Sequence, residues 1–228
     1  MLEKRALAEE QMDAPDLAPE IYARVLSDLA QVNSVTLARR PTLAFLDRLP
    51  RTDAPLRLLD VGFGDGDMLR AIARWARRRK IAVDLVGIDL NPRSAAVAQA
   101  KTPADVRIDY RTGDYASLAG EPWDVLISSL VAHHMTTAEL VSFLAFMERH
   151  AARGWFINDL HRHGFAYAGF PLLATIAGWH RIVREDGQLS IARSYRPAEW
   201  PPLLAAAGVT GARVNRIFPF RLCVEQIR

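Results

Sequence analysis

The sequence predicts an α/β fold, with a doubly wound, mostly parallel seven-stranded sheet, an antiparallel C-terminal hairpin and an N-terminal helical lid. Two observations predict this fold. Short apolar runs, typical of strands covered on both faces, alternate along the chain with segments of helical periodicity. Near the end of the chain, the strand-like runs at 212–217 and 221–227 flank the sequence Phe218-Pro219-Phe220, which indicates a final hairpin.

Five strand-like runs precede that hairpin, and helical signals lie between them. The runs are residues 56–61, 83–89, 106–114, 123–130 and 154–159. Residues 68–80 place their apolar side chains on one helical face. Asn91 followed by Pro92 predicts the N-terminus of a second helix, and a capping box of Thr136 and Glu139 predicts the start of a third.

The segments outside this alternation are also mainly helical. Residues 20–49 have apolar residues at helical spacing, with a break expected near Pro41. After the fifth strand, residues 165–179 predict a helix, residues 184–190 a loop, and residues 196–208 another helix.

Composition narrows the class of protein. The chain has 228 residues, half of them apolar, and a net charge of +3, as in a soluble globular protein. We divide it into an N-terminal helical extension, residues 1–50, whose charged start at 1–19 we expect to be loosely attached, and a Rossmann-like domain, residues 51–228. The single cysteine, Cys223, excludes a disulfide or a cysteine metal cluster within the chain. A charged N-terminus and the lack of a long apolar run favour a cytoplasmic protein that does not enter membranes.

A glycine-rich loop with an acidic partner is the most informative motif. Gly62, Gly64 and Gly66 lie between the first strand and the first sheet helix, and Asp60 precedes them. Glycines there permit positive φ and a close approach of a ligand to the backbone, and the helix N-terminus offers free N–H groups. Asp89 ends the second strand, where a carboxylate can accept hydrogen bonds from both ribose hydroxyls. Together these features predict a nucleotide site, and the alternative is a tight turn without a ligand.

The spacing of this loop differs from the dinucleotide fingerprint, whose third glycine would stand at Asp67. With an acid two residues before the first glycine, the sequence resembles the class I, Rossmann-like S-adenosylmethionine-dependent methyltransferases of the small-molecule type. The resemblance extends from about Leu56 to the C-terminus. Five motifs in the family's order carry it: LLDVGFGDGD, VGIDLNP, YRTGDY, WDVLISSLVAHHM and GWFINDLH. The final hairpin is similar to the family's reversed seventh strand.

The resemblance implies S-adenosyl-L-methionine as cofactor and S-adenosyl-L-homocysteine as product. The cofactor-binding positions that it implies, from the methionine end through the ribose to the adenine, are Asp60, Gly62, Phe63, Gly64, Asp89, Leu90, Asp114 and Tyr115. Among them, Asp89 would hold the ribose and Asp114 would contact the adenine amino group. Phe63 stands where many members have a small residue or cysteine, so the sequence departs from the family's pattern there.

Two histidines follow the fourth strand directly. Methyl transfer from a sulfonium is an in-line displacement, so the protein must align the acceptor and, for a hydroxyl, remove a proton. His133 and His134 lie at the carboxyl end of the strand, where ligands bind in such sheets, and histidine is the best-placed base near neutral pH. We expect one of them to be catalytic, with His134 slightly ahead of His133. The alternative is that one packs against the cofactor and the other caps the next helix.

The end of the fifth strand supplies further catalytic candidates: Asp159, His161 and Arg162. Asp159 would orient a histidine, as a carboxylate does for a base. Arg162 would hold an anionic acceptor or form a salt bridge with Asp159. The alternative is that Asn158 or Asp159 caps a helix and leaves His161 and His163 exposed.

Neither a metal nor a nucleic acid is expected at this site. Divalent-ion sites of this kind favour carboxylates, and only Asp159 is clearly near the predicted site. The basic run at 74–80 would suit an RNA phosphate, but it lies at a helix end, where cations offset the helix dipole, and on the far side from the expected crevice.

The segments 20–49 and 165–179 lie outside the predicted core sheet. In the family, such additions form a lid over the acceptor, which here would be lined by Phe165, Tyr167, Phe170, Leu172 and Trp179. An apolar pocket with few polar groups suits a small aromatic or polyketide-like molecule. We therefore expect O-methylation of such a natural product by a monomer or homodimer. N- or C-methylation, RNA methylation, and cofactor binding without catalysis are the alternatives.

Overall fold

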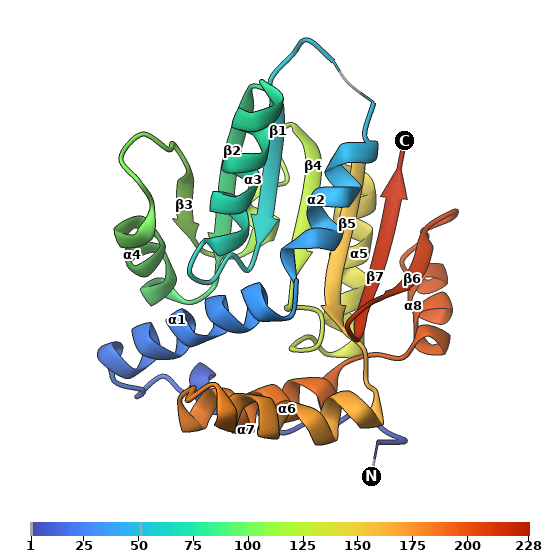
Figure 1. Ribbon diagram of the computed structural model, residues 1–228. Coiled ribbons are helices and arrows are strands. Elements are labelled where there is room, and N and C mark those ends of the chain that lie inside the picture. Colours follow the sequence, from blue (N-terminus) through green and yellow to red (C-terminus); the bar gives the residue numbers. More distant parts are fainter. Residues whose placement is uncertain (1, 51) are drawn as a thin grey trace.

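The sheet at the centre of the molecule has seven strands in the order β3-β2-β1-β4-β5-β7-β6 (Figure 1). The computed structural model describes residues 2–50 and 52–228. The strands are β1 Leu56–Val61, β2 Val83–Asp89, β3 Asp109–Thr112, β4 Trp123–Ser129, β5 Ala151–Leu160, β6 Arg213–Ile217 and β7 Arg221–Ile227. The first five run parallel, and β7 lies antiparallel between β5 and β6. The predicted α/β sheet with a reversed C-terminal hairpin is confirmed.

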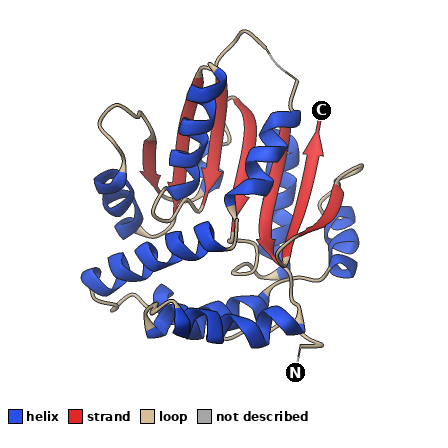
Figure 2. Cartoon of the chain, in the orientation of Figure 1, coloured by secondary structure: helices blue, strands red, loops and turns tan. Residues whose placement is uncertain are grey.

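Helices cover both faces of this sheet, as Figure 2 shows. On β1, Leu58 packs into one apolar cluster and Leu59 into another, because successive side chains of a strand point to opposite faces. The first cluster lies under α2 Arg39–Arg48, α3 Asp67–Arg79 and α4 Pro92–Lys101. The second lies under α5 Thr137–His150 and α8 Trp200–Ala206. The two clusters form the core that holds the strand ends in place.

A further group of helices lies across the carboxyl ends of the parallel strands. These are α1 Pro19–Val35, α6 Gly164–Ile176 and α7 Arg181–Arg193, drawn below the arrowheads of β1 and β5 in Figure 1. Val25 of α1, Ala174 of α6 and Val183 of α7 share a small apolar cluster of their own. The N-terminal helix and two helices from the second half of the chain therefore meet over the end of the sheet where ligands bind in open α/β folds.

Residues 184–190, which the sequence predicts to be a loop, form the middle of α7 instead. Asp186 accepts a hydrogen bond from the backbone N–H of Gln11 at 3.0 Å, so its carboxylate is satisfied by the N-terminal segment. Gly187 lies directly against Phe170, and a Cβ at Gly187 would come within 2.1 Å of that ring. The loop prediction was wrong because its polar residues and its glycine serve the packing between segments.

The N-terminal segment, expected to be loosely attached, packs along α7. Arg5 Nε donates to the carbonyl of Arg193 at 2.6 Å, and the Arg5 guanidinium lies 3.8 Å from the centre of the Tyr195 ring. The backbone N–H of Ala6 donates to the carbonyl of Ala192 at 3.1 Å. A 3₁₀ turn at Gln11–Asp13 then leads toward α1.

Three element boundaries also differ from the expectations. The break expected near Pro41 comes earlier, between the end of α1 at Val35 and the start of α2 at Arg39, and proline is tolerated in the first turn of α2. The strand predicted at 106–114 is limited to β3. The helix predicted at 196–208 begins as a 3₁₀ turn, Pro197–Glu199, and becomes α-helical only from Trp200.

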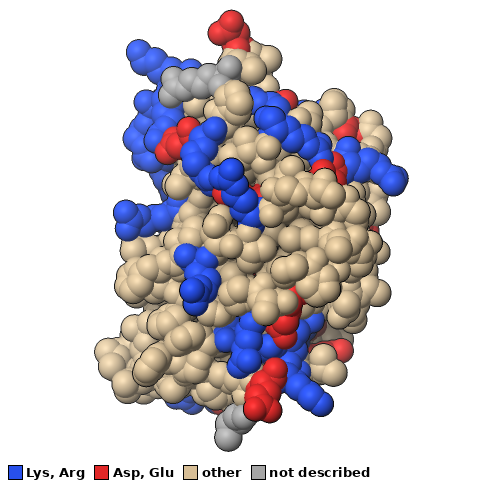
Figure 3. Space-filling view, turned by 90° about the vertical axis from the view of Figure 1, so that its right-hand side faces the viewer, with Lys and Arg blue, Asp and Glu red and all other residues tan. Residues whose placement is uncertain are grey.

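The charged surface is mixed in sign. Figure 3 shows one side of the molecule, on which the basic and acidic side chains of the described residues are interspersed among wide areas of other residues. The basic run at 74–80 ends α3, where Arg77 pairs with Asp105 and Arg79 with Asp47. Among residues 2–50 and 52–228, no helix has the length and apolar character that a bilayer span requires.

Candidate active site

A single cavity of about 1150 Å³ lies at the carboxyl ends of the parallel strands. Its walls come from the loops after β1, β2 and β4, from the end of β5, and from α1, α6, α7 and the N-terminal segment. The same cavity is thus lined by the glycine loop and Asp89 and by His133 and His134.

The glycine loop has the conformation that its composition predicts. Gly62, Gly64 and Gly66 have φ values of +77°, +55° and +76°, which L-residues with a Cβ rarely adopt. The N–H of Gly62 donates to the carbonyl of Ile88 at 2.8 Å and ties the loop to β2. A Cβ at Gly66 would also come within 2.4 Å of the Tyr110 hydroxyl. The loop is therefore held in one shape before any ligand binds.

Asp60 ends β1 as a buried carboxylate without a complete set of partners. It is 1 % exposed, it lines the cavity, and its Oδ1 accepts no hydrogen bond from any described residue. Burial, followed by the negative charges of Asp67 and Asp89, holds the pKa of Asp60 well above its usual range. Such a group calls for a cationic or hydrogen-bond-donating ligand.

Asp89 ends β2 and is fixed by two backbone N–H groups. Its Oδ2 accepts from Gly64 and its Oδ1 from Asn91, both at 2.9 Å. Burial raises the pKa of Asp89 in spite of these hydrogen bonds. Its neighbour Leu90 is 75 % exposed and lies at the mouth of the cavity. Both residues line the cavity, and their contacts with a nucleoside stay predictions.

The implied adenine positions are only partly at the cavity. Tyr115 lines it and is packed against Phe143 at a ring-centre distance of 4.9 Å. Asp114 is exposed, does not line the cavity, and uses its Oδ1 to accept from the N–H of Ala116 at the start of a 3₁₀ turn. Phe63, the departure from the family's pattern, is buried beneath the loop with one edge in the cavity wall. The cofactor contacts of these residues stay predictions.

His133 is held firmly by Asp159. Its Nδ1 lies 2.7 Å from Asp159 Oδ1, and its backbone N–H donates to Asp159 Oδ2 at 2.9 Å. Burial alone would raise the pKa of Asp159, but the His133 charge and the hydrogen bonds from His133 and Leu160 outweigh it and hold that pKa below its usual value. The predicted orientation of a histidine by Asp159 is therefore present, and the remaining nitrogen of His133, Nε2, is left for the cavity.

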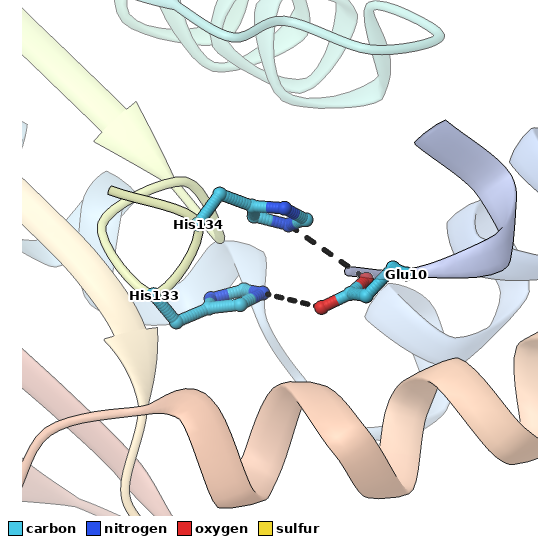
Figure 4. Close-up of side chains that lie close together, drawn as sticks. All are labelled: Glu10, His133 and His134. Carbon is cyan, nitrogen blue, oxygen red and sulfur yellow. Dashed lines mark ion pairs between the residues drawn. The ribbon is translucent and has the colours of Figure 1, made fainter. Parts of the chain in front are cut away.

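The N-terminal segment brings two acids to the histidines. Glu10 Oε1 lies 3.6 Å from His133 Nε2, and Glu10 Oε2 lies 3.8 Å from His134 Nε2, as Figure 4 shows. Asp13 Oδ2 lies 3.2 Å from His134 Nδ1. The Glu10 carboxyl is further held by Ser190 Oγ, which donates to Oε1 at 2.8 Å. Burial raises the pKa of Glu10 to about 7. Glu10, His133 and His134 offer three ligand atoms within 4.8 Å of one another, so this cluster has the composition of a metal site.

Sequence reasoning missed Glu10 and Asp13 altogether. They lie in a charged segment that gave no sign of docking, and only the fold brings that segment beside the loop after β4. Arg5 and Arg193 fasten the same loop, because each donates to the carbonyl of His133, at 3.1 Å and 3.2 Å. The sequence contains no local signal for these long-range contacts.

Arg221 is a second functional candidate that the sequence did not indicate. It begins β7, is 2 % exposed, and lines the cavity. Its Nη2 donates to Thr36 Oγ1 at 3.0 Å, whereas its Nε and Nη1 have no partner among the described residues. The cavity thus contains a buried cation with two free donors.

Two predicted catalytic residues point away from the cavity. Arg162 does not line it; its buried side chain pairs with Glu199 at 2.5 Å and not with Asp159. His161 also lies outside the cavity wall, where its ring packs beside His163. The pairing predicted for Arg162 was wrong, because the turn at 197–199 supplies a nearer carboxylate.

The helix cap expected after β5 is made by another residue. His163 Nδ1 accepts from the N–H of Phe165 and caps α6, whereas Asn158 is buried and donates to the carbonyl of Ala38 at 2.7 Å. Of the predicted lid-lining residues, Phe165 and Phe170 line the cavity and Tyr167, Leu172 and Trp179 do not. At the polar end of β5, Asp159 therefore belongs to the site because it contacts His133, whereas Asn158 and Arg162 make structural contacts.

Residues 58–154 match the family model described as a methyltransferase domain. No curated protein matches the sequence. Solved structures of similar fold include the plantazolicin methyltransferase BpumL in complex with SAH, at 14 % identity and a TM-score of 0.66, covering 95 % of this chain and 91 % of that one. Magnesium protoporphyrin IX methyltransferase from Synechocystis PCC 6803 with bound SAH has 17 % identity and a TM-score of 0.56, covering 96 % and 91 %.

A third similar structure is human N-acetylserotonin methyltransferase in complex with SAM, at 14 % identity and a TM-score of 0.61. It covers 92 % of this chain, which spans 56 % of that longer protein. Residues 58–154 are thus similar to a methyltransferase domain, and the sheet order is that of the class I methyltransferase fold. The family match over residues 58–154 and the fold of these solved structures agree with the resemblance found in the sequence.

Proposed function

We propose that the protein transfers a methyl group from S-adenosylmethionine to a small molecule, most favourably to a hydroxyl of an aromatic or polyketide-like compound. One observation carries the proposal: a single cavity is lined both by the glycine loop with Asp60 and Asp89 and by the paired imidazoles of His133 and His134. A donor bound at the glycine loop would thus share the cavity with the two histidines.

The residues of the loop end fit the donor. The unpartnered Oδ1 of Asp60 would accept a hydrogen bond from the ammonium of the methionine part, which would also balance its buried charge. Asp89 would accept hydrogen bonds from the ribose hydroxyls with the lone pairs that Gly64 and Asn91 leave free. Leu90 and Tyr115 would lie beside the adenine.

The part of the cavity left for the acceptor is apolar with a few polar groups, which favours an aromatic acceptor. Phe165 and Phe170 of α6 and Ile191 of α7 supply apolar walls. The free donors of Arg221 suit an anionic or carbonyl oxygen on the same molecule. The volume of the cavity exceeds the ~300–1000 Å³ typical of a single drug-sized ligand, so donor and acceptor can bind together.

For this reaction the protein has to align donor and acceptor and to assist removal of the hydroxyl proton. In the transfer, the acceptor oxygen forms a bond to the methyl carbon as the carbon–sulfur bond breaks, and the hydroxyl proton must leave. The enclosed cavity aligns the two molecules, and His133 and His134 lie where the acceptor hydroxyl would point. We propose that these two histidines, with Asp159 behind His133, handle the acceptor hydroxyl.

We also propose that the N-terminal extension, residues 1–50, serves as a lid together with α6 and α7. Tyr22, Val25 and Leu26 of α1 line the cavity from the side opposite the sheet. α1 and the α6–α7 pair, which lies between β5 and α8, would separate to admit ligands and close to exclude water.

Calorimetry with S-adenosylhomocysteine tests the donor site. Wild-type protein should bind one equivalent, and Asp89→Ala should weaken binding strongly. Asp84→Ala is the matched control, because Asp84 is an exposed acid on the same strand. No binding by the wild type, or equal binding by Asp89→Ala and Asp84→Ala, would overturn the donor site.

Incubation with methyl-labelled cofactor and a panel of phenols, hydroxybenzoates, amines and RNA tests the acceptor. Label in phenols or hydroxybenzoates supports the proposal, whereas label only in amines, carbon acids or RNA replaces it with another transferase. Cofactor binding without label in any class would leave a binding protein.

A further inference from the structure

We propose that Glu10, His133 and His134 bind a divalent transition-metal ion of the zinc class at the acceptor end of the cavity. The inference deepens the proposed function, since it concerns the site at which the acceptor would bind, but it depends on the side-chain geometry alone. No cysteine is involved.

The three side chains bring their ligand atoms within 4.8 Å of one another, and two of the distances match the spacing of metal ligands. The two Glu10–histidine distances, 3.6 Å and 3.8 Å, are longer than an N–H···O hydrogen bond. Ligand atoms bound tetrahedrally at 2.0–2.1 Å from a zinc ion lie about 3.4 Å apart, which is close to both distances. Figure 4 shows the two imidazoles and the carboxylate turned toward one another from separate segments.

The orientation of both imidazoles is set by carboxylates on the far nitrogen. Asp159 contacts Nδ1 of His133 at 2.7 Å, and Asp13 contacts Nδ1 of His134 at 3.2 Å. An outer carboxylate of this kind fixes the tautomer and directs Nε2 toward a metal. Here it occurs on both histidines, and both Nε2 atoms face the same carboxylate. Two unrelated loop histidines would have no need for an outer carboxylate on each ring.

The remaining coordination positions face the ligand cavity. Glu10, His133 and His134 all line it, although Glu10 and His133 are themselves buried. Two histidines, one glutamate and an open position are the donor set of catalytic zinc sites. The open position would accept an oxygen of the acceptor, and a metal-bound hydroxyl loses its proton more readily than a free one.

The donor set also indicates the kind of ion. Imidazole nitrogens suit zinc, cobalt, nickel and iron, whereas magnesium and calcium prefer sites built from oxygen. Two neutral imidazoles and one carboxylate leave a divalent ion with a net charge of +1, which favours an anionic acceptor oxygen. A metal site was not expected from the sequence, because Glu10 lies in the N-terminal segment, far along the chain from the histidines.

Cobalt titration of tag-free, full-length protein, stripped of metals with a chelator, tests the inference. Co²⁺ should bind saturably with one ion per chain and give visible absorption bands, and Zn²⁺ should displace it. Glu10→Gln and His134→Gln should abolish the saturable signal, and Asp159→Asn should weaken binding by about 10- to 100-fold. The controls are Glu9→Gln and His150→Gln, an exposed acid next to Glu10 and a histidine on α5, and both should bind as the wild type does.

Absence of saturable Co²⁺ binding to folded wild-type protein would overturn the inference, and so would equal binding by Glu10→Gln and Glu9→Gln. Thermal unfolding of each variant establishes that it is folded. S-adenosylhomocysteine binding, measured on the same metal-free protein, separates this inference from the proposed function. Cofactor binding without metal binding removes only the metal, and metal binding without cofactor binding removes only the methyl transfer.

Discussion

Asp159 contacts His133 at two points, with Oδ1 2.7 Å from the imidazole Nδ1 and Oδ2 2.9 Å from the backbone nitrogen. The first contact fixes the ring and the second fixes the loop that carries it. Because Asp159 lies on β5, an interior strand paired on both sides, the position of His133 is set by the sheet and not by the loop alone. The same strand thereby connects the core of the fold to the acceptor end of the cavity.

From this placement we expect that replacing His133 lowers turnover, whereas replacing His161 does not. His133→Ala should lower kcat by about 10²- to 10⁴-fold, the range of general acid–base assistance, because it removes the imidazole that would act on the acceptor hydroxyl directly or through a bound metal ion. His161→Ala should leave turnover unchanged, because His161 lies outside the cavity wall. Steady-state kinetics on a methylated acceptor would decide this. A large loss in His161→Ala with full activity in His133→Ala would reverse the assignment.

Replacing Asp60 by asparagine should raise the stability of the fold but weaken cofactor binding. In the ligand-free protein its raised pKa means that the folded state holds the proton more tightly than the unfolded state. Stability from this group is therefore fully present below the unfolded value of 3.8 and is lost as pH rises through the folded pKa. Asp60→Asn removes the penalty, so at pH 7 it should unfold at a higher denaturant concentration than the wild type.

The same variant should bind S-adenosylhomocysteine more weakly. Loss of a charge-assisted hydrogen bond costs ~1.5–3 kcal/mol, or about 10- to 150-fold in affinity. The stability gain should shrink as pH falls toward 4, which chemical denaturation at several pH values would measure. A variant that is less stable than the wild type at pH 7, or one with unchanged affinity, would count against this role of Asp60.

Arg5 should affect turnover without touching the cofactor. It donates to the carbonyls of His133 and Met135 and so ties the N-terminal segment to the loop after β4. Arg5→Ala should speed hydrogen exchange at residues 130–136 and lower kcat several-fold, with cofactor affinity unchanged. Lys4→Ala, an exposed neighbouring cation, is the control. Unaltered exchange and turnover in Arg5→Ala would show that the segment is not needed to position the histidines.

The fold and the donor end of the site could be predicted because their signals are local. The strand at 56–61, the glycine loop and Asp89 belong to one strand–loop–helix–strand unit, in which spacing along the chain determines spacing in the structure. The pairing of Asp159 with a histidine followed from the rule that parallel strand ends share one edge of the sheet.

The acceptor end could not be predicted to the same extent, because tertiary contacts decide it. Glu10 lies beside the histidines because the N-terminal segment docks on α7, and the same segment contacts Asp186 and Ser190 of the stretch expected to be a loop. The partner of Arg162 was also unpredictable, because Glu199 lies in a later turn of the chain. Polar residues whose partners lie far along the chain look like solvent-facing residues in a sequence.

Gly66 tests how much the rigid loop contributes to stability. Its φ of +76° costs an L-residue roughly 1–2 kcal/mol, and a Cβ would meet the Tyr110 hydroxyl at 2.4 Å. Gly66→Ala should therefore lower the free energy of unfolding by at least ~1 kcal/mol and weaken cofactor binding. Gly120→Ala is the matched control, because its Cβ would meet nothing within 4 Å. Equal stability of the two variants would mean that the loop adapts freely.

Cys223 should make the protein less stable at alkaline pH. It lies on β7 with no exposed surface, and burial raises the pKa of its thiol from 9.0 to about 12. The unfolded state therefore loses its thiol proton first, so stability from this group is fully present below about pH 9 and declines as pH rises toward 12. The slope for one proton is at most about 1.4 kcal/mol per pH unit.

Cys223→Ala should flatten the decline in denaturation midpoint between pH 9 and 10.5, and native wild-type protein should resist thiol reagents until it unfolds. Rapid labelling of the folded protein, or parallel pH profiles of wild type and variant, would contradict the burial of this thiol in the sheet.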